Sequence, residues 1–191
     1  MKHDHLDTEK VIGTTRQWVD KVVVGLNLCP FAKRELMTGS LFFEVSEAET
    51  EEDLLVDLQK ALNLINEDAD VETMLLIHPA VLQKFYDYNE FLNYADALLV
   101  QMGLEGIYQI ASFHPDYQFA DTEANDLCNY TNKSPYPMLH LIAEESVEKA
   151  IESHPDSDSI PLRNIELLES LGKSEMQRLL EQCADSSHKL K

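Results

Sequence analysis

The sequence predicts a single α/β domain with a mainly parallel sheet of about four strands, helices packed on that sheet and a helical C-terminal tail. Three observations support this. Short apolar runs alternate along the chain with helical patterns of 15 to 18 residues, which is typical of βαβ units. The run from Met74 to Ile77 is continuously apolar, as in strands covered on both faces. A chain of 191 residues that is 44% hydrophobic can bury a core of its own.

Helices are predicted wherever apolar residues recur every three or four positions. The first is expected over 8–26, where Trp18, Val19 and Val22 belong to one buried stripe. Thr50 is expected to cap the second, over 51–65, because its first turn is acidic. The remaining helices are expected at 85–102 before Gly103, at 144–153, at 161–172 beginning with Pro161, and at 174–183.

Strands are predicted at four apolar runs, over 41–45, 73–77, 107–113 and 138–143. A histidine followed by a proline ends the second and the third of these runs, and a long irregular stretch follows over 114–136. We expect one domain spanning 1–191, in which residues 8–155 form the α/β core and residues 156–191 the helical tail.

The chain is strongly acidic, with 35 acidic and 15 basic side chains and a net charge of −20. This argues against nucleic acid and anionic membrane surfaces as partners, because both are bound through clustered Lys and Arg. No apolar run approaches the ~20 residues that span a bilayer. Residues 1–7 are polar, unlike a signal peptide, so we expect a cytoplasmic protein. The three cysteines, at 29, 128 and 183, form no disulfide or zinc pattern.

Three histidines lie at or within predicted strands, near the strand ends where α/β proteins bind ligands. His78 and His114 follow strand ends, and parallel strands would bring both imidazoles to the same edge of the sheet. His140 lies inside the fourth strand on the side of Met138 and Ile142, so it faces an apolar layer or a pocket. Each histidine is either a base, an acid or a metal ligand, or a hydrogen-bonded structural group.

The stretch 114–136 is long for a loop inside a domain, and such loops are usually functional. It combines aromatic rings with amides, hydroxyls and one cation. We predict a rigid ligand-binding loop; the alternative is a loop that satisfies its own backbone. The residues expected to bind substrate are Asp116, Tyr117, Asn129, Asn132, Lys133 and Ser134, with Lys133 available to a carboxylate or phosphate.

Cys29 precedes Pro30 just after the first predicted helix, which would place its thiol at the N-terminus of a helix. Helix N-termini and nearby cations, here Lys33 and Arg34, favour thiolates. Cys29 is therefore a candidate nucleophile, redox centre or metal ligand, and the Cys-Pro pair is also a haem-binding signal. The alternative is a small buried apolar residue.

Three segments form a specific set: 28–32 (LCPFA), 112–120 (SFHPDYQFA) and 129–142 (NYTNKSPYPMLHLI). Together they resemble a bacterial family known as domain of unknown function 1415, and the resemblance extends to about Gly172. The family usually has arginine where this chain has Lys133, and lysine cannot make the bidentate contact of arginine. The family pattern does not call for cysteine at Cys128. The resemblance implies no particular activity.

We expect a soluble enzyme acting on a small anionic metabolite, with catalytic Cys29, His114 and His140 beside the 116–134 loop. Cys29 would be a nucleophile or metal ligand, His114 a base or ligand, and His140 a supporting acid or orienting group. The alternatives are a non-catalytic metal- or haem-binding module and a protein-interaction module that uses the C-terminal helices. The sequence names no cofactor and leaves the oligomeric state open. It contains no GxGxxG, GxxxxGK[ST], GxSxG or HExxH motif.

Overall fold

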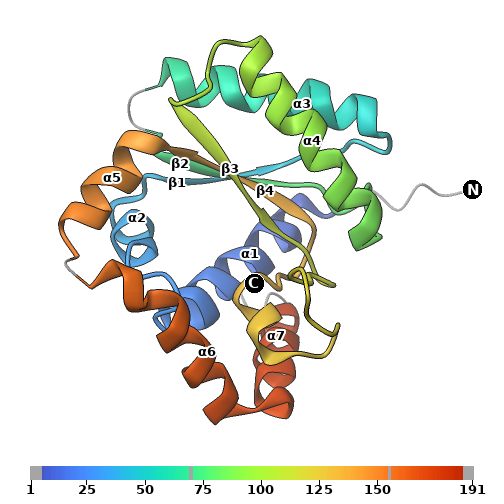
Figure 1. Ribbon diagram of the computed structural model, residues 1–191. Helices are drawn as coiled ribbons and strands as arrows, with labels where there is room; N and C mark the ends of the chain where they lie inside the picture. The colour runs from blue at the N-terminus through green and yellow to red at the C-terminus, as the bar shows by residue number, and fades with distance from the viewer. Residues whose placement is uncertain (1–5, 69–70, 155, 187–191) are drawn as a thin grey trace, which may run out of the picture.

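The computed structural model describes residues 6–68, 71–154 and 156–186, and its centre is a sheet with helices on both faces (Figure 1). Within these residues the sheet has four strands in the order β1-β2-β4-β3. They are β1 (Leu41–Val45), β2 (Thr73–Ile77), β3 (Tyr108–Phe113) and β4 (Met138–Ala143). The predicted single α/β domain with four strands is therefore confirmed. Residues 1–5 of the predicted N-terminus and 187–191 of the predicted tail lie outside the described residues.

The prediction of a mainly parallel sheet is wrong. β1 pairs with β2 in parallel, whereas β4 pairs antiparallel with both β2 and β3. The reason lies in the connection between β3 and β4. A parallel connection needs a crossover, usually a helix, but residues 114–137 hold just the short 3-10 helix η2 (Leu127–Thr131). The chain therefore returns in the opposite direction, and β4 enters the sheet between β2 and β3.

One face of the sheet is covered by α3 (Glu51–Glu67) and α4 (Phe85–Gln101), which lie above the sheet in Figure 1. α3 begins as predicted, because Thr50 Oγ1 accepts a hydrogen bond from the Asp53 backbone N–H at 3.1 Å. The leucine stripe of α3 and the rings of Tyr88 and Phe91 from α4 are buried together against this face. The residues buried between this face and the two helices are mainly apolar.

The other face carries α1 (Thr8–Trp18), α2 (Ala32–Thr38), α5 (Glu144–Glu152), α6 (Ile160–Leu171) and α7 (Lys173–Ser186), with a 3-10 helix, η3, at Ser157–Ser159 (Figure 1). α7 packs on α1, and α6 packs on η2. Leu168, Met176 and Cys183 of the tail helices are buried in the same cluster as Trp18, so the tail is part of the core. In the described part of the chain, no helix combines the length and apolar character needed to cross a bilayer.

The predicted helix over 8–26 does not remain an α-helix. After Trp18 it continues as a π-helix, η1 (Val19–Val24). Its backbone hydrogen bonds join residues that are five positions apart in the chain, instead of the four of an α-helix. A Cβ atom on Gly25 would lie 2.3 Å from the carbonyl oxygen of Lys21, so this turn accepts only glycine where it ends. The short helix α2 follows. Its seven residues include no buried one, so apolar periodicity gives no sign of it.

Candidate functional site

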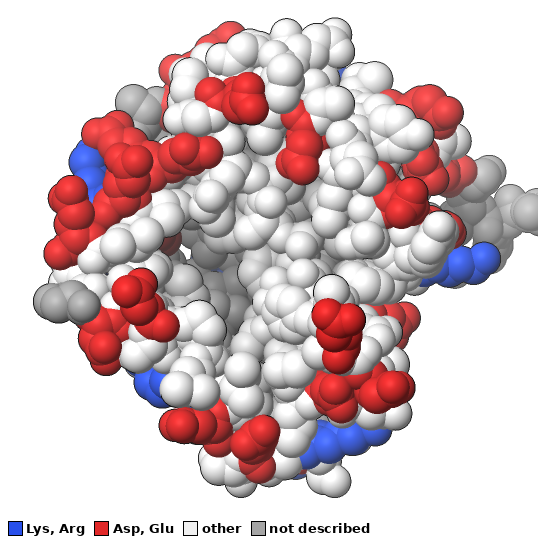
Figure 2. Space-filling view, in the orientation of Figure 1, with Lys and Arg blue, Asp and Glu red and all other residues white. Residues whose placement is uncertain are grey.

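A cavity of about 280 Å³ lies between the sheet and the helices of the second layer. Figure 2 shows a hollow at the place that α2, α5 and the sheet border in Figure 1. The apolar part of its wall includes Trp18, Val19, Val23, Leu75, Phe113 and Val147. The polar residues in the wall are Cys29, Glu35, Glu72, Thr73, His140 and Ser146. A mainly apolar pocket with a few convergent polar groups is the usual form of a small-molecule site.

The hydrogen bonds of Thr73 fix the tautomer of His140. The Thr73 hydroxyl donates its single proton to the carbonyl oxygen of Leu141 at 2.9 Å. Its oxygen also lies 2.7 Å from Nε2 of His140, so it must accept a hydrogen bond from that nitrogen. Nε2 therefore carries the ring proton, and Nδ1 keeps a lone pair. Among the described residues nothing donates to Nδ1.

Burial keeps His140 neutral. Removal of the ring from water lowers the pKa of His140 from 6.5 to about 4. At pH 7 the imidazole is thus an uncharged hydrogen-bond acceptor in the cavity wall. A group with so low a pKa takes up protons poorly at neutral pH, which favours an orienting role for His140 over that of a general base.

Cys29 lies on the turn between η1 and α2, three residues before α2 begins, and lines the cavity. Its thiol is free and half-buried. Two side chains of α6 hold this turn from outside. Nη2 of Arg163 donates to the carbonyl oxygen of Asn27 at 2.8 Å, and Nδ2 of Asn164 donates to that of Leu28 at 2.7 Å. These two contacts anchor the turn that carries the thiol.

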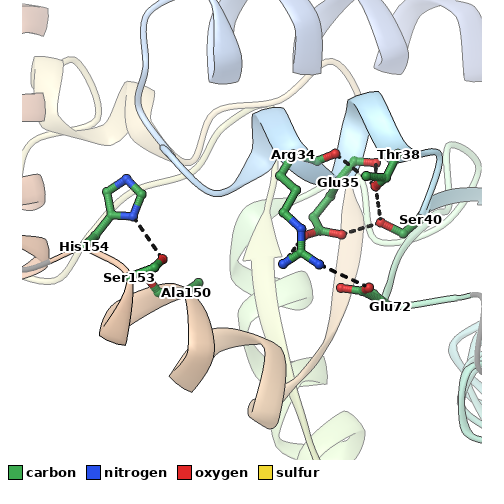
Figure 3. Close-up of polar contacts among 8 residues, drawn as sticks. All are labelled: Arg34, Glu35, Thr38, Ser40, Glu72, Ala150, Ser153 and His154. Carbon is green, nitrogen blue, oxygen red and sulfur yellow. Dashed lines mark hydrogen bonds and ion pairs between the residues drawn. The ribbon is translucent and has the colours of Figure 1, made fainter.

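Two glutamates belong to the cavity wall, and their carboxylates lie beside Arg34. They are Glu35 and Glu72, and the Arg34 guanidinium lies 3.9 Å from Glu35 and 3.7 Å from Glu72 (Figure 3). Glu35 also accepts a hydrogen bond from the hydroxyl of Ser40. Arg34 itself is largely exposed and is not part of the cavity wall. The two carboxylates therefore share one solvated counter-ion.

The structure does not bring the three predicted catalytic residues into one site. Cys29 and His140 line the same cavity, but His114 lies on the opposite face of the sheet, with its ring 5.1 Å from that of Tyr88 in α4. β2 and β3 end opposite the same residue of β4, so His78 and His114 do follow strand ends at one edge of the sheet. This edge faces the α4 layer and not the cavity.

Both ring nitrogens of His114 already have partners. Nε2 donates to the carbonyl oxygen of Leu82 at 3.1 Å, and Nδ1 accepts the backbone N–H of Asp116 at 3.0 Å. His78 is fully buried, and its Nδ1 donates to the carbonyl oxygen of Val81 at 3.2 Å. Nε2 of His78 has no hydrogen-bond partner in the described part of the chain. Desolvation lowers the pKa of both histidines, that of His78 to about 4.

The six residues predicted to bind substrate all lie outside the cavity wall: Asp116, Tyr117, Asn129, Asn132, Lys133 and Ser134. Asp116 and Tyr117, at the start of the loop, lie near α4. The backbone N–H of Asp116 bonds to His114, and the ring of Tyr117 lies 5.1 Å from that of Phe85. These contacts hold the start of the loop against the α4 side of the sheet.

The two asparagines bind backbone groups around the loop. Oδ1 of Asn129 accepts the N–H of Phe119 at 2.9 Å, and Nδ2 donates to the carbonyl of Glu123 at 2.8 Å. Nδ2 of Asn132 donates to the carbonyl of Ser112, in β3, at 3.0 Å. Their amides thus tie the loop to itself and to the sheet.

Ser134 and Lys133 also donate hydrogen bonds to backbone carbonyls of the loop. The hydroxyl of Ser134 donates to the carbonyl of Tyr136 at 2.7 Å. Nζ of Lys133 donates to the carbonyl of Ala124 at 3.3 Å and lies 5.1 Å from the centre of the Tyr130 ring. Burial lowers the pKa of Lys133. The side chains of this loop are therefore engaged in holding its own conformation.

The sequence did not point to Thr73, Glu35 or Glu72. Thr73 is the first residue of an otherwise apolar strand and lies on the same side of the sheet as His140. A hydroxyl residue in such a strand is the one sequence feature that could have indicated Thr73. The two glutamates look like surface residues. In the part of the chain that the structure describes, no group of three or more His, Cys, Asp and Glu side chains could hold a metal ion.

Comparison with known proteins gives one match. No curated protein and no solved structure matches the chain. Residues 10–178 match the family described as "Protein of unknown function (DUF1415)". The matched region contains all four strands and every residue of the cavity wall. The chain therefore belongs to this family, as its three specific segments suggested.

Proposed function

We propose that this cavity is the functional site, that it binds a small molecule, and that the Cys29 thiol acts on this molecule as a nucleophile. One observation carries the proposal: Cys29, whose thiol is free, and His140, whose Nδ1 is unprotonated, line the same mainly apolar cavity. A further observation supports it. The wall includes part of a π-helix, and π-helical turns are frequent at functional sites.

Each part of the wall has a separate role in this proposal. Sγ of Cys29 supplies the electron pair for a bond to an electrophilic carbon of the substrate, and the thiol proton leaves with the displaced group or to water. Nδ1 of His140 accepts a hydrogen bond from the substrate and so orients it toward the thiol. The rings of Trp18 and Phe113 hold the apolar body.

Alkylation of the cysteines tests the proposal. Cys128 is an internal comparator, because it is also free and half-buried but does not line the cavity. Chloroacetamide and N-benzylchloroacetamide are compared at each cysteine by peptide mass spectrometry. A benzyl group that buries ~100 Å² gains roughly 2.5 kcal/mol. We therefore expect the benzyl reagent to be favoured at Cys29, relative to Cys128, by more than about tenfold.

Ala111 offers a matched control, because it lies in the cavity wall on β3. Ala111→Leu would reduce the cavity without changing the thiol, so it should remove the benzyl preference at Cys29. The same variant should change the alkylation of Cys29 by chloroacetamide only slightly. An equal benzyl preference at both cysteines, or one that survives Ala111→Leu, would refute the proposed site.

A further inference from the structure

We infer that the cavity takes an unbranched acyl chain of about eight to ten carbons, presented as a thioester whose carbonyl carbon reacts with Cys29. The inference rests on the proposed function, since it names the substrate class of that same cavity. It gives the ligand an uncharged body in place of the anionic one that the sequence suggested, because Lys133, on which that expectation depended, lies outside the cavity.

The floor of the cavity crosses the whole sheet. Side chains of all four strands line it in two neighbouring rows: Leu41, Thr73 and Ile142, and then Leu75, His140 and Ala111. Neighbouring strands are ~4.8 Å apart, so the floor extends ~14 Å from β1 to β3, whereas the two rows are ~7 Å apart. The floor is therefore about twice as long as it is wide.

The volume of the cavity matches one extended chain on this floor. A volume of about 280 Å³ spread along ~14 Å leaves a mean cross-section of ~20 Å². Apolar atoms in contact lie up to ~4.5 Å apart, so a single hydrocarbon chain occupies roughly that cross-section. An extended chain advances ~1.2 Å per atom, as the polypeptide backbone does. With a contact distance left at the end of the chain, ~14 Å holds about eight to ten carbons.

The cavity wall offers such a chain contacts with carbon atoms and few hydrogen bonds. Most of the wall is apolar, and its polar side chains are engaged within the protein. The Thr73 hydroxyl is hydrogen-bonded to His140, and the Glu35 carboxylate to the hydroxyl of Ser40. A polar ligand body would therefore lose its water with little replacement, whereas each methylene group that is buried favours binding.

The Cys29 thiol determines how the chain must end. A hydrocarbon chain reacts with a thiol where it carries an electrophilic carbon, and the carbonyl carbon of a thioester is one. Among the wall residues that the structure describes none is Lys or Arg, so a free carboxylate has no counter-ion there, whereas a thioester needs none.

The proposed step is an exchange of thioesters. A bond forms between Sγ of Cys29 and the carbonyl carbon, the bond from that carbon to the carrier sulfur breaks, and the carrier thiol leaves with the proton of Cys29. The acyl chain alone accounts for the volume of the cavity, so the carrier stays at the mouth of the hollow that Figure 2 shows.

Thioesters of N-acetylcysteamine test this inference, with butanoyl, octanoyl, decanoyl, dodecanoyl and 1-adamantaneacetyl as the acyl groups. The rates at which they acylate Cys29 and Cys128 of the full chain are measured by peptide mass spectrometry, and their ratio cancels the intrinsic reactivity of each thioester. We expect this ratio to rise about two- to threefold per methylene group from butanoyl to octanoyl, and to be no higher for dodecanoyl than for decanoyl. The compact adamantane cage should stay about tenfold or more below decanoyl, because it does not fit a narrow cavity.

Variants at two buried leucines show whether this cavity sets the chain length. Leu41 is buried at the β1 end of the floor, so Leu41→Ala would lengthen the cavity by roughly the three carbons removed. In this variant dodecanoyl should become favoured over decanoyl by about threefold or more. Leu58→Ala makes the same change in the core on the other face of the sheet and should leave the order of the thioesters as it is. The wild-type series is decisive by itself if Leu41→Ala fails to fold.

The outcomes separate this inference from the proposed function. If no thioester acylates Cys29, if the ratio does not depend on chain length or still rises at dodecanoyl, or if the cage equals decanoyl, the substrate class is wrong. The cavity remains a binding site in that case as long as Cys29 shows the benzyl preference that Ala111→Leu removes. If that preference is absent as well, the proposed function also fails.

Discussion

Acidification is expected to destabilise this protein well above the pH at which its carboxylates titrate, and the buried His78 is one cause. The ring is fully buried and stacks on Tyr88 at 5.8 Å. Its Nδ1 already has a partner, but protonation would add an N–H at Nε2, for which the described residues offer no acceptor. A charge and an unsatisfied donor would then be buried together.

The magnitude follows from the depressed pKa. The unfolded chain binds protons at His78 with a pKa near 6.5, and the folded chain with a pKa of about 4. Stability is therefore complete above pH 6.5 and falls as the pH drops toward 4, because the unfolded state takes up the proton first. The loss is about 3 kcal/mol for His78. His140 has the same lowered pKa, so it adds a loss of similar size, which is common to the proteins compared below.

Urea unfolding at pH 7.5, 6.5, 5.5 and 4.5 measures this loss, with fluorescence of the single tryptophan, Trp18, as the signal. His78→Asn removes the titration, and its amide can still donate toward Val81. We expect this variant to be less stable at pH 7.5 but to lose about 2.5 kcal/mol less than the wild type on going to pH 4.5. The exposed His154→Asn is the control. The same pH dependence in the wild type and in His78→Asn would refute the reasoning.

Three further predictions use the same unfolding measurement. Gly25→Ala should cost about 2 kcal/mol or more, because its Cβ would meet the Lys21 carbonyl at 2.3 Å; a neutral result would mean that the π-helical turn is not as described. Asn164→Ala should cost about 1–3 kcal/mol through the lost hydrogen bond to Leu28, and should weaken the benzyl selectivity at Cys29. Met176→Ala should cost about 2–5 kcal/mol, whereas a freely projecting tail would show almost no change.

The sequence predicted the bounds of the strands closely, because each strand is an apolar run that ends at residues unfavourable to a strand, such as the His-Pro pairs after β2 and β3. The predicted strand directions were wrong because they depend on where β4 is inserted, and β4 lies between two strands that precede it in the chain. It also missed α2 and the π-helix. α2 has no apolar stripe, and the valines of η1 fit an α-helical period nearly as well as a π-helical one.

Two of the three residues predicted to be catalytic lie together in the structure. Cys29 and His140 could be selected because a cysteine before a proline and a histidine inside an apolar strand are unusual, and they do line one cavity. His114 also follows a strand end, but a position at a strand end does not tell on which face of the sheet the side chain lies. Phe113 lines the cavity, so the next residue along an extended backbone points to the other side. Glu35 and Glu72 could not be selected, because their place in the cavity wall depends on the fold and not on residue type.

The position of β4 also has a consequence for synthesis of the chain. β2 and β3 are not paired with each other; both are paired with β4, which is the last strand to leave the ribosome. Until residue 143 has emerged, neither the β2 edge that β4 covers in the finished sheet nor β3 has its partner strand. Such edges invite association with other chains. We therefore expect the incomplete chain to associate with other chains more readily than the finished fold does.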